Sequence, residues 1–136
     1  MEETGRGNFV GKVTEVTNIL TNRKEFVLFY KVNENGYKQV LPGISLKTLV
    51  YGENTLFSEF RMEANNILPQ HSHYHEQTGY LVKGRIKLTI GQQTFEAGPG
   101  DSWCIPGNTD HSAEILENSL AIEVFSPVRE DYLPDK

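Results

Sequence analysis

Three of the four histidines in this chain fall at alternate positions of one short stretch, PQHSHYHEQTGY (69–80). On an extended strand His71 and His73 point to the same side, and Gln77 has the same parity. His111 lies far along the chain, at the end of PGDSWCIPGNTDH. Three imidazole nitrogens and an amide oxygen make a donor set that divalent first-row metals accept, with positions left for water or substrate. The spacing therefore indicates a metal site, and the alternative is a histidine cluster exposed to solvent.

The strand that carries these donors can meet His111 only if the sheet closes on itself, and the chain favours strands almost throughout. ISLKTLVY (44–51) and TLFSEFRME (55–63) alternate apolar and polar residues, as half-buried strands do. YLVKGRIKLTI (80–90) is rich in β-branched and aromatic residues, and shorter strands are expected in TFEA, SWCI and LAIEVF. Turn residues separate these segments at about 8–12-residue spacing, which is typical of a sandwich or barrel. The sequence predicts an all-β fold without an amphipathic helix.

Residue types also predict two of the turns. Gly91-Gln92 fits a two-residue hairpin loop with glycine at its first central position. GPGD (98–101) fits a type II turn, because its proline sets φ and Gly100 accepts a positive φ. The segment KEFVLFYKV (24–32) is less determined, and it could be an edge strand or a dimer arm.

Composition excludes several functional classes. The 136 residues suffice for one domain with a core of its own. There are 18 acidic and 13 basic residues, and the net charge of −5 disfavours a nucleic-acid surface. No apolar run is long enough to span a membrane, and the N-terminus MEETGRGNF lacks the features of a signal peptide. A single cysteine allows no internal disulfide, so we expect a cytoplasmic protein in which Cys104 is a small buried apolar residue.

Two motifs resemble those of the cupin family. HSHYHEQTGYLVKG is similar to the first cupin motif, H-x-H-x(3,4)-E-x(6)-G, with Gln77 in place of its glutamate and Gly84 as its glycine. GDSWCIPGNTDH is similar to the second, G-x(5)-P-x-G-x(2)-H-x(3)-N, in Gly100, Pro106 and His111. Two positions of the second motif depart from the family, since Asn108 replaces a glycine and Ile115 an asparagine.

The cupin resemblance implies a fold and a metal. The fold is a double-stranded β-helix, or jelly-roll barrel, formed by residues 41–136, with residues 1–40 as an N-terminal arm or extra strand. The cofactor is one divalent metal ion, either zinc, nickel, iron or manganese. Its ligands would be His71, His73, Gln77 and His111.

The C-terminal stretch LAIEVFSPVREDYL (120–133) resembles the last strand and tail of the KdgF family of pectin-degradation proteins. That family opens 4,5-unsaturated monouronates to linear ketouronates. Its acidic, phenylalanine and arginine positions around the metal pocket correspond to Glu123, Phe125 and Arg129, and the family acid is aspartate. The resemblance implies an isomerase-like enzyme of uronate catabolism, with a sugar acid as its small-molecule substrate, that assembles as a homodimer.

Chemistry suggests a role for each of these residues. A planar guanidinium such as Arg129 matches a carboxylate, and Glu123 could move a proton if its pKa is tuned toward neutrality. Phe125 and Gly79 would line the substrate space. Because glycine has no side chain, Gly79 would leave room there for a substrate. The alternative for Glu123 and Arg129 is a structural ion pair.

Other readings of the site and of the function remain open. His75 is expected in a turn, either exposed or behind the metal ligands, while Trp103 and Tyr80 are expected in the core or at the rim. The alternative functions are a metal-dependent cupin that binds or senses a small ligand without turnover, and a cupin dioxygenase.

Overall fold

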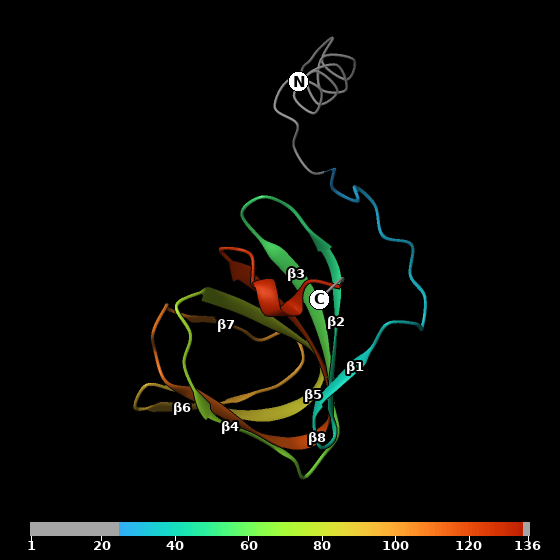
Figure 1. Ribbon diagram of the computed structural model, residues 1–136. Helices are drawn as coiled ribbons and strands as arrows, with labels where there is room; N and C mark the ends of the chain where they lie inside the picture. Colours follow the sequence, from blue (N-terminus) through green and yellow to red (C-terminus); the bar gives the residue numbers. More distant parts are fainter. Residues whose placement is uncertain (1–24, 135–136) are drawn as a thin grey trace, which may run out of the picture.

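The computed structural model describes residues 25–134, which form antiparallel strands curled into a barrel (Figure 1). A 3-10 helix, η1 (Glu130–Tyr132), follows the last strand and is the only helix in this part of the chain. No helix among the described residues has the length and apolar character needed to cross a membrane. The predicted all-β jelly-roll fold is confirmed. Its strands are β1 (Lys38–Leu41), β2 (Ile44–Tyr51), β3 (Leu56–Met62), β4 (Ile67–His71), β5 (Glu76–Ile90), β6 (Gln93–Ala97), β7 (Ser102–Ile105) and β8 (His111–Ser126).

The two longest strands, β5 and β8, each take part in two sheets. The first half of β5 pairs with β7, where Gln77 is opposite Ile105, and its second half pairs with β6, where Ile86 is opposite Ala97. In the same way β8 pairs first with β4 and then with β3. One sheet therefore has the order β1–β2–β3–β8–β5–β7 and the other the order β4–β8–β5–β6. The barrel closes because both long strands curve from one sheet into the other (Figure 1).

Gly84 marks the bend at which β5 passes between the sheets. Its φ is +102°, a left-handed value that favours glycine. A Cβ at this position would lie 2.1 Å from Ser119 Oγ and 2.6 Å from the carbonyl oxygen of Asn118. The β5–β8 ladder also shifts register here. A side chain at this position would therefore force the two long strands apart where the barrel must curve.

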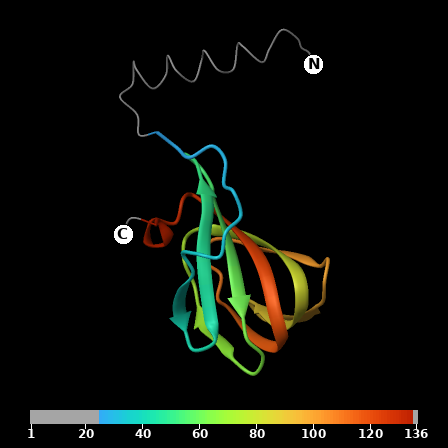
Figure 2. The same cartoon turned by 90° about the vertical axis from the view of Figure 1, so that its right-hand side faces the viewer.

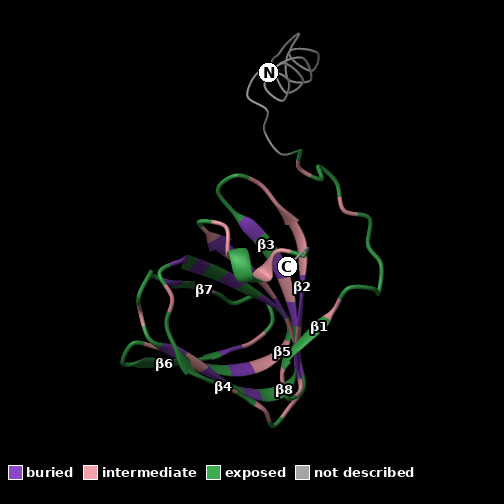
Figure 3. Ribbon diagram, in the orientation of Figure 1, coloured by how far each residue is buried: buried purple, intermediate pink, exposed green. Residues whose placement is uncertain are grey.

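Apolar side chains from both sheets form the core inside the barrel. Figure 3 marks the buried positions along the strands. In β3 the alternation is regular. Every second residue is buried, and the residues between them are half-buried or exposed; the buried residues are Leu56, Ser58, Phe60 and Met62. The fully buried side chains include Phe125 and Leu81 from the two long strands. Polar residues that are also buried, among them Gln77, His111 and Glu123, gather inside the same barrel.

Both predicted turns are present. Gly91 has a φ of +61° and joins β5 to β6 through a two-residue loop. Gly100 has a φ of +93°, and the N–H of Asp101 donates to the carbonyl of Gly98 at 3.0 Å, as a turn over 98–101 requires.

The prediction that Cys104 is buried is wrong, because its side chain is exposed. The alternation of β7 turns Trp103 and Ile105 inward, which leaves Cys104 on the outer side of the sheet. Tyr80 is also on the outer side of its strand, opposite in parity to the buried Gly79, and so it belongs neither to the core nor to the rim of the site.

The segment that could have been an edge strand or a dimer arm forms no strand in residues 25–32, and Lys24 lies outside the described residues. Strand β1 (Lys38–Leu41) spans the expected boundary at residue 40 and pairs with β2. The division into an arm of residues 1–40 and a cupin domain of residues 41–136 stays a prediction.

Candidate metal centre

The fold brings three of the predicted ligands together. His71 ends β4 and is paired with His111 at the start of β8, and their ring centroids are 4.2 Å apart. His73 lies just beyond β4, and its ring centroid is 4.9 Å from that of His111. One ligand nitrogen from each of the three rings lies within 4.8 Å of the others. The expectation that His71 and His73 share one strand is wrong, since the chain leaves the sheet after His71.

Each of the three imidazoles has its Nδ1 next to a backbone carbonyl. An Nδ1–H that donates to a carbonyl leaves Nε2 as the lone-pair nitrogen, and this is how proteins orient histidines that bind metals. The Nε2 atoms are therefore the ones free to act as ligands. The Nδ1–carbonyl pairs are His71 with Pro69 (2.8 Å), His73 with His75 (3.1 Å) and His111 with Thr109 (2.8 Å).

Gln77, the predicted fourth ligand, lies beside His73. Its Oε1 lies 3.1 Å from His73 Nε2, and its Nε2 donates to Glu123 Oε1 at 2.9 Å. The hydrogen bond to Glu123 fixes the orientation of the Gln77 amide. A lone pair of Gln77 Oε1 therefore faces the lone pair of His73 Nε2. Two ligands at right angles around a metal with bonds of about 2.1 Å lie about 3 Å apart. The separation fits a shared cation.

His111 Nε2 is buried and has no hydrogen-bond partner among the described residues. A buried acceptor without a partner is costly, and a metal ion beside it would satisfy it. Together with the convergence of His71, His73 and Gln77, this shows that the residues present fit a divalent metal. Their three nitrogens and one oxygen suit first-row metals better than Ca²⁺ or Mg²⁺, which prefer oxygen ligands.

Two loops held against each other place His73. The N–H of Asn108 donates to the His73 carbonyl at 2.7 Å, and Asn108 has a φ of +62°. Gly107 allows this approach, because a Cβ there would lie 2.4 Å from the carbonyl oxygen of Tyr74. The residues Gly107 and Asn108 of the second motif therefore position His73 of the first.

His75 is buried, at 7% exposure, and so it is not an exposed turn residue. Its ring stacks on Tyr74 with centroids 4.1 Å apart, and its Nδ1 has no hydrogen-bond partner among the described residues. Its carbonyl is the acceptor for His73 Nδ1. The backbone of His75, rather than its imidazole, supports the three converging rings.

Two of the three converging histidines, His73 and His111, have lowered pKa values. Burial, and then the positive charge of Arg129, lower the pKa of His73 to about 4. Burial is also the main cause that lowers the pKa of His111 and of His75. Neutral imidazoles are the ligating form, so His73 and His111 do not have to lose protons before they bind a metal at pH 7.

These pKa values predict how the metal-free protein responds to acid. Between pH 6.5 and about 4 the unfolded chain binds protons that folded His73 does not, so the free energy of unfolding should fall as the pH falls through this window. Urea unfolding of chelator-treated protein at several pH values measures this. The variant His73→Asn should lose part of the decrease, and an unchanged slope would contradict the lowered pKa of His73.

Glu123 lies beside the histidine cluster and is buried, at 8% exposure. Its Oε1 accepts hydrogen bonds from Gln77 Nε2 (2.9 Å) and from Trp103 Nε1 (3.2 Å). Burial raises the pKa of Glu123 to about 7, and the two hydrogen bonds oppose that shift. A carboxyl group with a pKa near neutrality can both take up and release a proton, as general acid–base catalysis needs.

Gly79 has a different role from the one expected. It is paired with Glu123 on β8 and with Trp103 on β7, so the three residues form a row across the sheet. A Cβ on Gly79 would lie 2.1 Å from Trp103 Nε1 and 2.5 Å from Glu123 Oε1. The space above Gly79 is thus filled by the hydrogen bond between these two side chains and is not open to a substrate.

Trp103 is a functional candidate that sequence reasoning missed, because it was expected only to pack in the core or at the rim. Its indole holds the carboxylate of Glu123. The parity of β7 turns its side chain inward, but the sequence does not show that Glu123 lies two strands away.

Arg129 and Phe125 lie at the same site. The guanidinium of Arg129 stacks over the ring of Phe125 (5.2 Å to the centroid) and over that of Tyr132 (4.1 Å). Its Nε is 3.1 Å from Asp131 Oδ1. The expected alternative, an ion pair between Arg129 and Glu123, does not occur among the described residues. Tyr132 was not predicted, since nothing in the tail sequence indicates that it folds back.

Three of the four predicted metal ligands, the carboxylate of Glu123 and the guanidinium of Arg129 line one small cavity of about 60 Å³. The cavity has room for about two waters, or for an ion with the reacting end of a ligand. The polar residues that line it include His71, Gln77, His111, Glu123 and Arg129.

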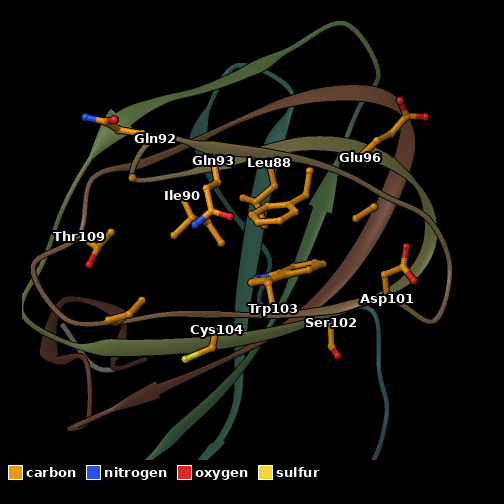
Figure 4. A pocket seen from close by; sticks show the side chains of 14 residues that line it. Leu88, Ile90, Gln92, Gln93, Glu96, Asp101, Ser102, Trp103, Cys104 and Thr109 are labelled. Atoms are coloured by element: carbon orange, nitrogen blue, oxygen red, sulfur yellow. The ribbon is translucent and has the colours of Figure 1, made fainter.

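A larger groove of about 660 Å³ lies on the other side of Trp103, beside β6 and β7 (Figure 4). Leu88 and Trp103 line both the groove and the cavity, so the indole stands between them. The lining of the groove includes Glu96 and Asp101, and none of the described residues that line the groove is a lysine or an arginine. This composition disfavours a carboxylate ligand in the groove.

Comparisons with known proteins agree with this architecture. Residues 58–126 match the family described as Cupin domain. KdgF from Halomonas sp. is 31% identical, covers 77% of this chain and 99% of its own, and superposes with a TM-score of 0.73. An RmlC-like cupin from Shewanella frigidimarina is 22% identical, with coverage of 81% and 100% and a TM-score of 0.75. A search of curated proteins gave no match.

A more distant structure, oxalate decarboxylase from Bacillus subtilis with its Mn(II) centres, is 24% identical. It covers 62% of this chain and 25% of its own, with a TM-score of 0.56. At identities below 25%, the likeness to this structure and to the RmlC-like protein shows the fold alone.

Proposed function

Because this chain belongs to the cupin family and is a small cupin resembling KdgF, we propose that it holds one divalent metal ion and opens 4,5-unsaturated monouronates to linear ketouronates. The observation that carries this proposal is the shared cavity. A buried carboxyl group with a pKa of about 7, a guanidinium and two of the three converging imidazoles, those of His71 and His111, line the same small space. These are the groups that the ring opening of an acidic enol ether requires.

The reaction is an isomerisation in which bonds and protons balance. The C1 hydroxyl loses its proton, the bond between C1 and the ring oxygen breaks, and C1 becomes an aldehyde. The electron pair left on the ring oxygen forms the C5 ketone as C4 accepts a proton. One proton leaves an oxygen and one arrives at carbon, so a single carboxyl group can carry out both transfers.

Glu123 is the residue we assign to these transfers. Gln77 and Trp103 hold its carboxylate by hydrogen bonds to the same oxygen, which keeps the group in place while it changes protonation state. A bound metal would supply Lewis-acid stabilisation of the negative charge that develops on the substrate oxygen. The buried surroundings strengthen these electrostatic interactions.

Arg129 is the residue we assign to the substrate carboxylate. The rings of Phe125 and Tyr132 pack against the guanidinium, and Asp131 contacts its Nε, so its position is fixed before a ligand arrives. A fixed planar guanidinium can form two parallel hydrogen bonds to a carboxylate. The substrate class would accordingly be a small sugar acid rather than a neutral sugar.

The ring-opening activity is tested by absorbance. Metal-loaded protein mixed with an unsaturated galacturonate should remove the absorbance of the conjugated double bond, and chelator-treated protein should not. A control with oxygen excluded should give the same rate, because the isomerisation consumes no oxidant. Metal-loaded protein that leaves the double bond intact would contradict the proposal.

Replacement of Arg129 should weaken the use of acidic substrates. Arg129→Ala removes a charge-assisted contact, and we expect kcat/KM on an unsaturated uronate to fall by at least about 2 kcal/mol, or roughly 30-fold. Arg129→Lys should also be impaired, because an ammonium cannot form the bidentate contact. Kinetics on both variants measure the loss, and wild-type kcat/KM in Arg129→Ala would remove the guanidinium from substrate binding.

A further inference from the structure

Two larger hollows share walls with the metal cavity, and a sugar acid could reach the cavity from either of them. The groove beside β6 and β7 shares Leu88 and Trp103 with the cavity. A pocket of about 490 Å³, called the basic pocket below, shares Arg129 and Tyr132 with the cavity instead. The lining of the basic pocket also includes Lys38, Val40, Lys47, Thr48 and Asp131.

The basic pocket lies between the start of β1, the strand β2 and the tail, residues 127–134. Lys38 on β1 is opposite Leu46 on β2, and Thr48 Oγ1 on β2 donates to the carbonyl of Tyr132 in the tail at 2.5 Å. Figure 2 shows the tail in red and the segment before β1 in blue, both close to β2. Strands β1 and β7 are the two edges of one sheet, so the basic pocket and the groove lie at opposite edges.

The two hollows differ in charge. The basic pocket is lined by three cationic side chains, Lys38, Lys47 and Arg129, and by one carboxylate, that of Asp131. The groove is lined by two carboxylates and, among the described residues, by no cationic side chain. A cleft in which one sign of charge prevails raises the local concentration of ligands of the opposite sign. An acidic sugar is therefore favoured in the basic pocket and disfavoured in the groove.

Lys47 holds its charge beside the basic pocket in a fixed position. Its Nζ donates to the carbonyl oxygen and to Oδ1 of Asn33, at 3.2 and 3.0 Å. The ring centroids of Tyr30 and Tyr37 lie 4.7 and 5.2 Å from the same nitrogen. These partners are neutral, so they hold the ammonium group in place without cancelling its charge. Lys38, in contrast, is exposed and open to a ligand.

The two shared walls also differ in what their displacement would cost. Trp103 stands between the groove and the cavity and donates to Glu123 at 3.2 Å, so its displacement would release the carboxylate. Tyr132 belongs to η1, which has no buried residue. Apart from the bond from β2 to its carbonyl, it is held by edge contacts with the rings of Phe60 (6.2 Å) and Phe125 (5.3 Å). The tail can therefore move without breaking a hydrogen bond of Glu123, as a lid over an active site must.

We propose that a sugar acid reaches the metal centre through the basic pocket, where Lys38 and Lys47 bind its carboxylate before Arg129 holds it. The identity of this ligand rests on the proposed function, whereas the choice of the route rests on the charges and the walls of the two hollows. Arg129 lines both the basic pocket and the cavity, so the carboxylate has a cationic partner throughout its passage. The two lysines would thus select acids over neutral sugars before any chemistry takes place.

The affinity for galacturonate, a saturated acid that cannot undergo the ring opening, tests the two lysines. Titration of metal-loaded, full-length protein followed by NMR should show weaker binding to Lys38→Gln by about 2–5-fold, the range expected for loss of an exposed charge pair. The affinity of this variant should also depend less on the concentration of NaCl than that of the wild type. Lys83→Gln is the matched control, because Lys83 on β5 is exposed and lines neither the cavity nor the two hollows, and it should bind galacturonate as the wild type does.

A bulky maleimide attached at one position at a time tests the route. In a Cys104→Ser background, which removes the only cysteine of the chain, Val40→Cys places the label in the basic pocket. Gln93→Cys places the same label in the groove (Figure 4). Val40 and Gln93 are both exposed, so neither label has to enter the core. The labelled Val40→Cys protein should lose galacturonate binding, and the labelled Gln93→Cys protein should retain it.

Wild-type affinity in Lys38→Gln or in the labelled Val40→Cys protein overturns the proposal, as does loss of binding when Gln93→Cys is labelled. A wild type that binds galactose as tightly as galacturonate also overturns it. Ring opening is measured separately on the unsaturated sugar. Lys38-dependent binding of galacturonate without ring opening supports the route and contradicts only the proposed activity, whereas full ring opening by the labelled Val40→Cys protein contradicts the route and supports the activity.

Discussion

Glu123→Gln should lower turnover on an unsaturated monouronate by about 10²–10⁴-fold, the usual contribution of a general acid or base. The amide oxygen of the new side chain can still accept from Gln77 and Trp103, so the fold and the metal content should remain. Substrate binding should change little, because proton transfer is realised only in the transition state. Steady-state kinetics, metal analysis and the melting temperature together measure this.

Glu123→Asp is the matched variant, and it should stay active because a carboxyl group remains. Its side chain is shorter by one methylene, so the geometry toward Gln77 and Trp103 changes while the chemistry does not. Turnover near the wild-type value in Glu123→Gln would end the assignment of Glu123 as acid and base. Equal losses in both variants would instead indicate that the position of the side chain matters more than its proton.

Loss of a residue that hydrogen-bonds to a metal ligand typically lowers metal affinity by about 10–100-fold. His73→Ala should lower it by more, because this change removes a predicted ligand itself. The same loss is expected for His71→Ala and His111→Ala, whose rings converge with that of His73. Activity should disappear in parallel. Metal analysis after dialysis, combined with titration calorimetry, measures the loss.

His75→Ala is the control for these variants. It removes a buried imidazole near the site, but it keeps the backbone carbonyl that orients His73. We expect its metal content to stay close to the wild-type value, although its melting temperature falls because the change leaves a cavity. Full metal retention in His73→Ala, or metal loss in His75→Ala, would contradict the ligand set.

The sequence by itself determined most of the strands, both predicted turns and the three histidines that converge in the barrel, while β1 and β4 were not predicted. Strand alternation is a local property, and so is the positive φ that Gly91 and Gly100 accept. Residue type and spacing also pointed to the histidines, because imidazole is a common ligand of first-row metals. The two motifs did not need to be adjacent in the chain for their convergence to be predicted, since a closed sheet is the only arrangement that joins them.

Only the tertiary structure decided what surrounds those residues. The alternation of side chains along a strand predicts that Trp103 and Glu123 point inward. The register between β7, β5 and β8 decides that they meet above Gly79. The same packing buries His75, leaves Cys104 outside and raises the pKa of Glu123. Burial and charge proximity depend on which strand lies across from which, and that is set by contacts between residues far apart in the chain. The sequence could therefore predict which groups are present, while their hydrogen bonds and protonation required the folded barrel.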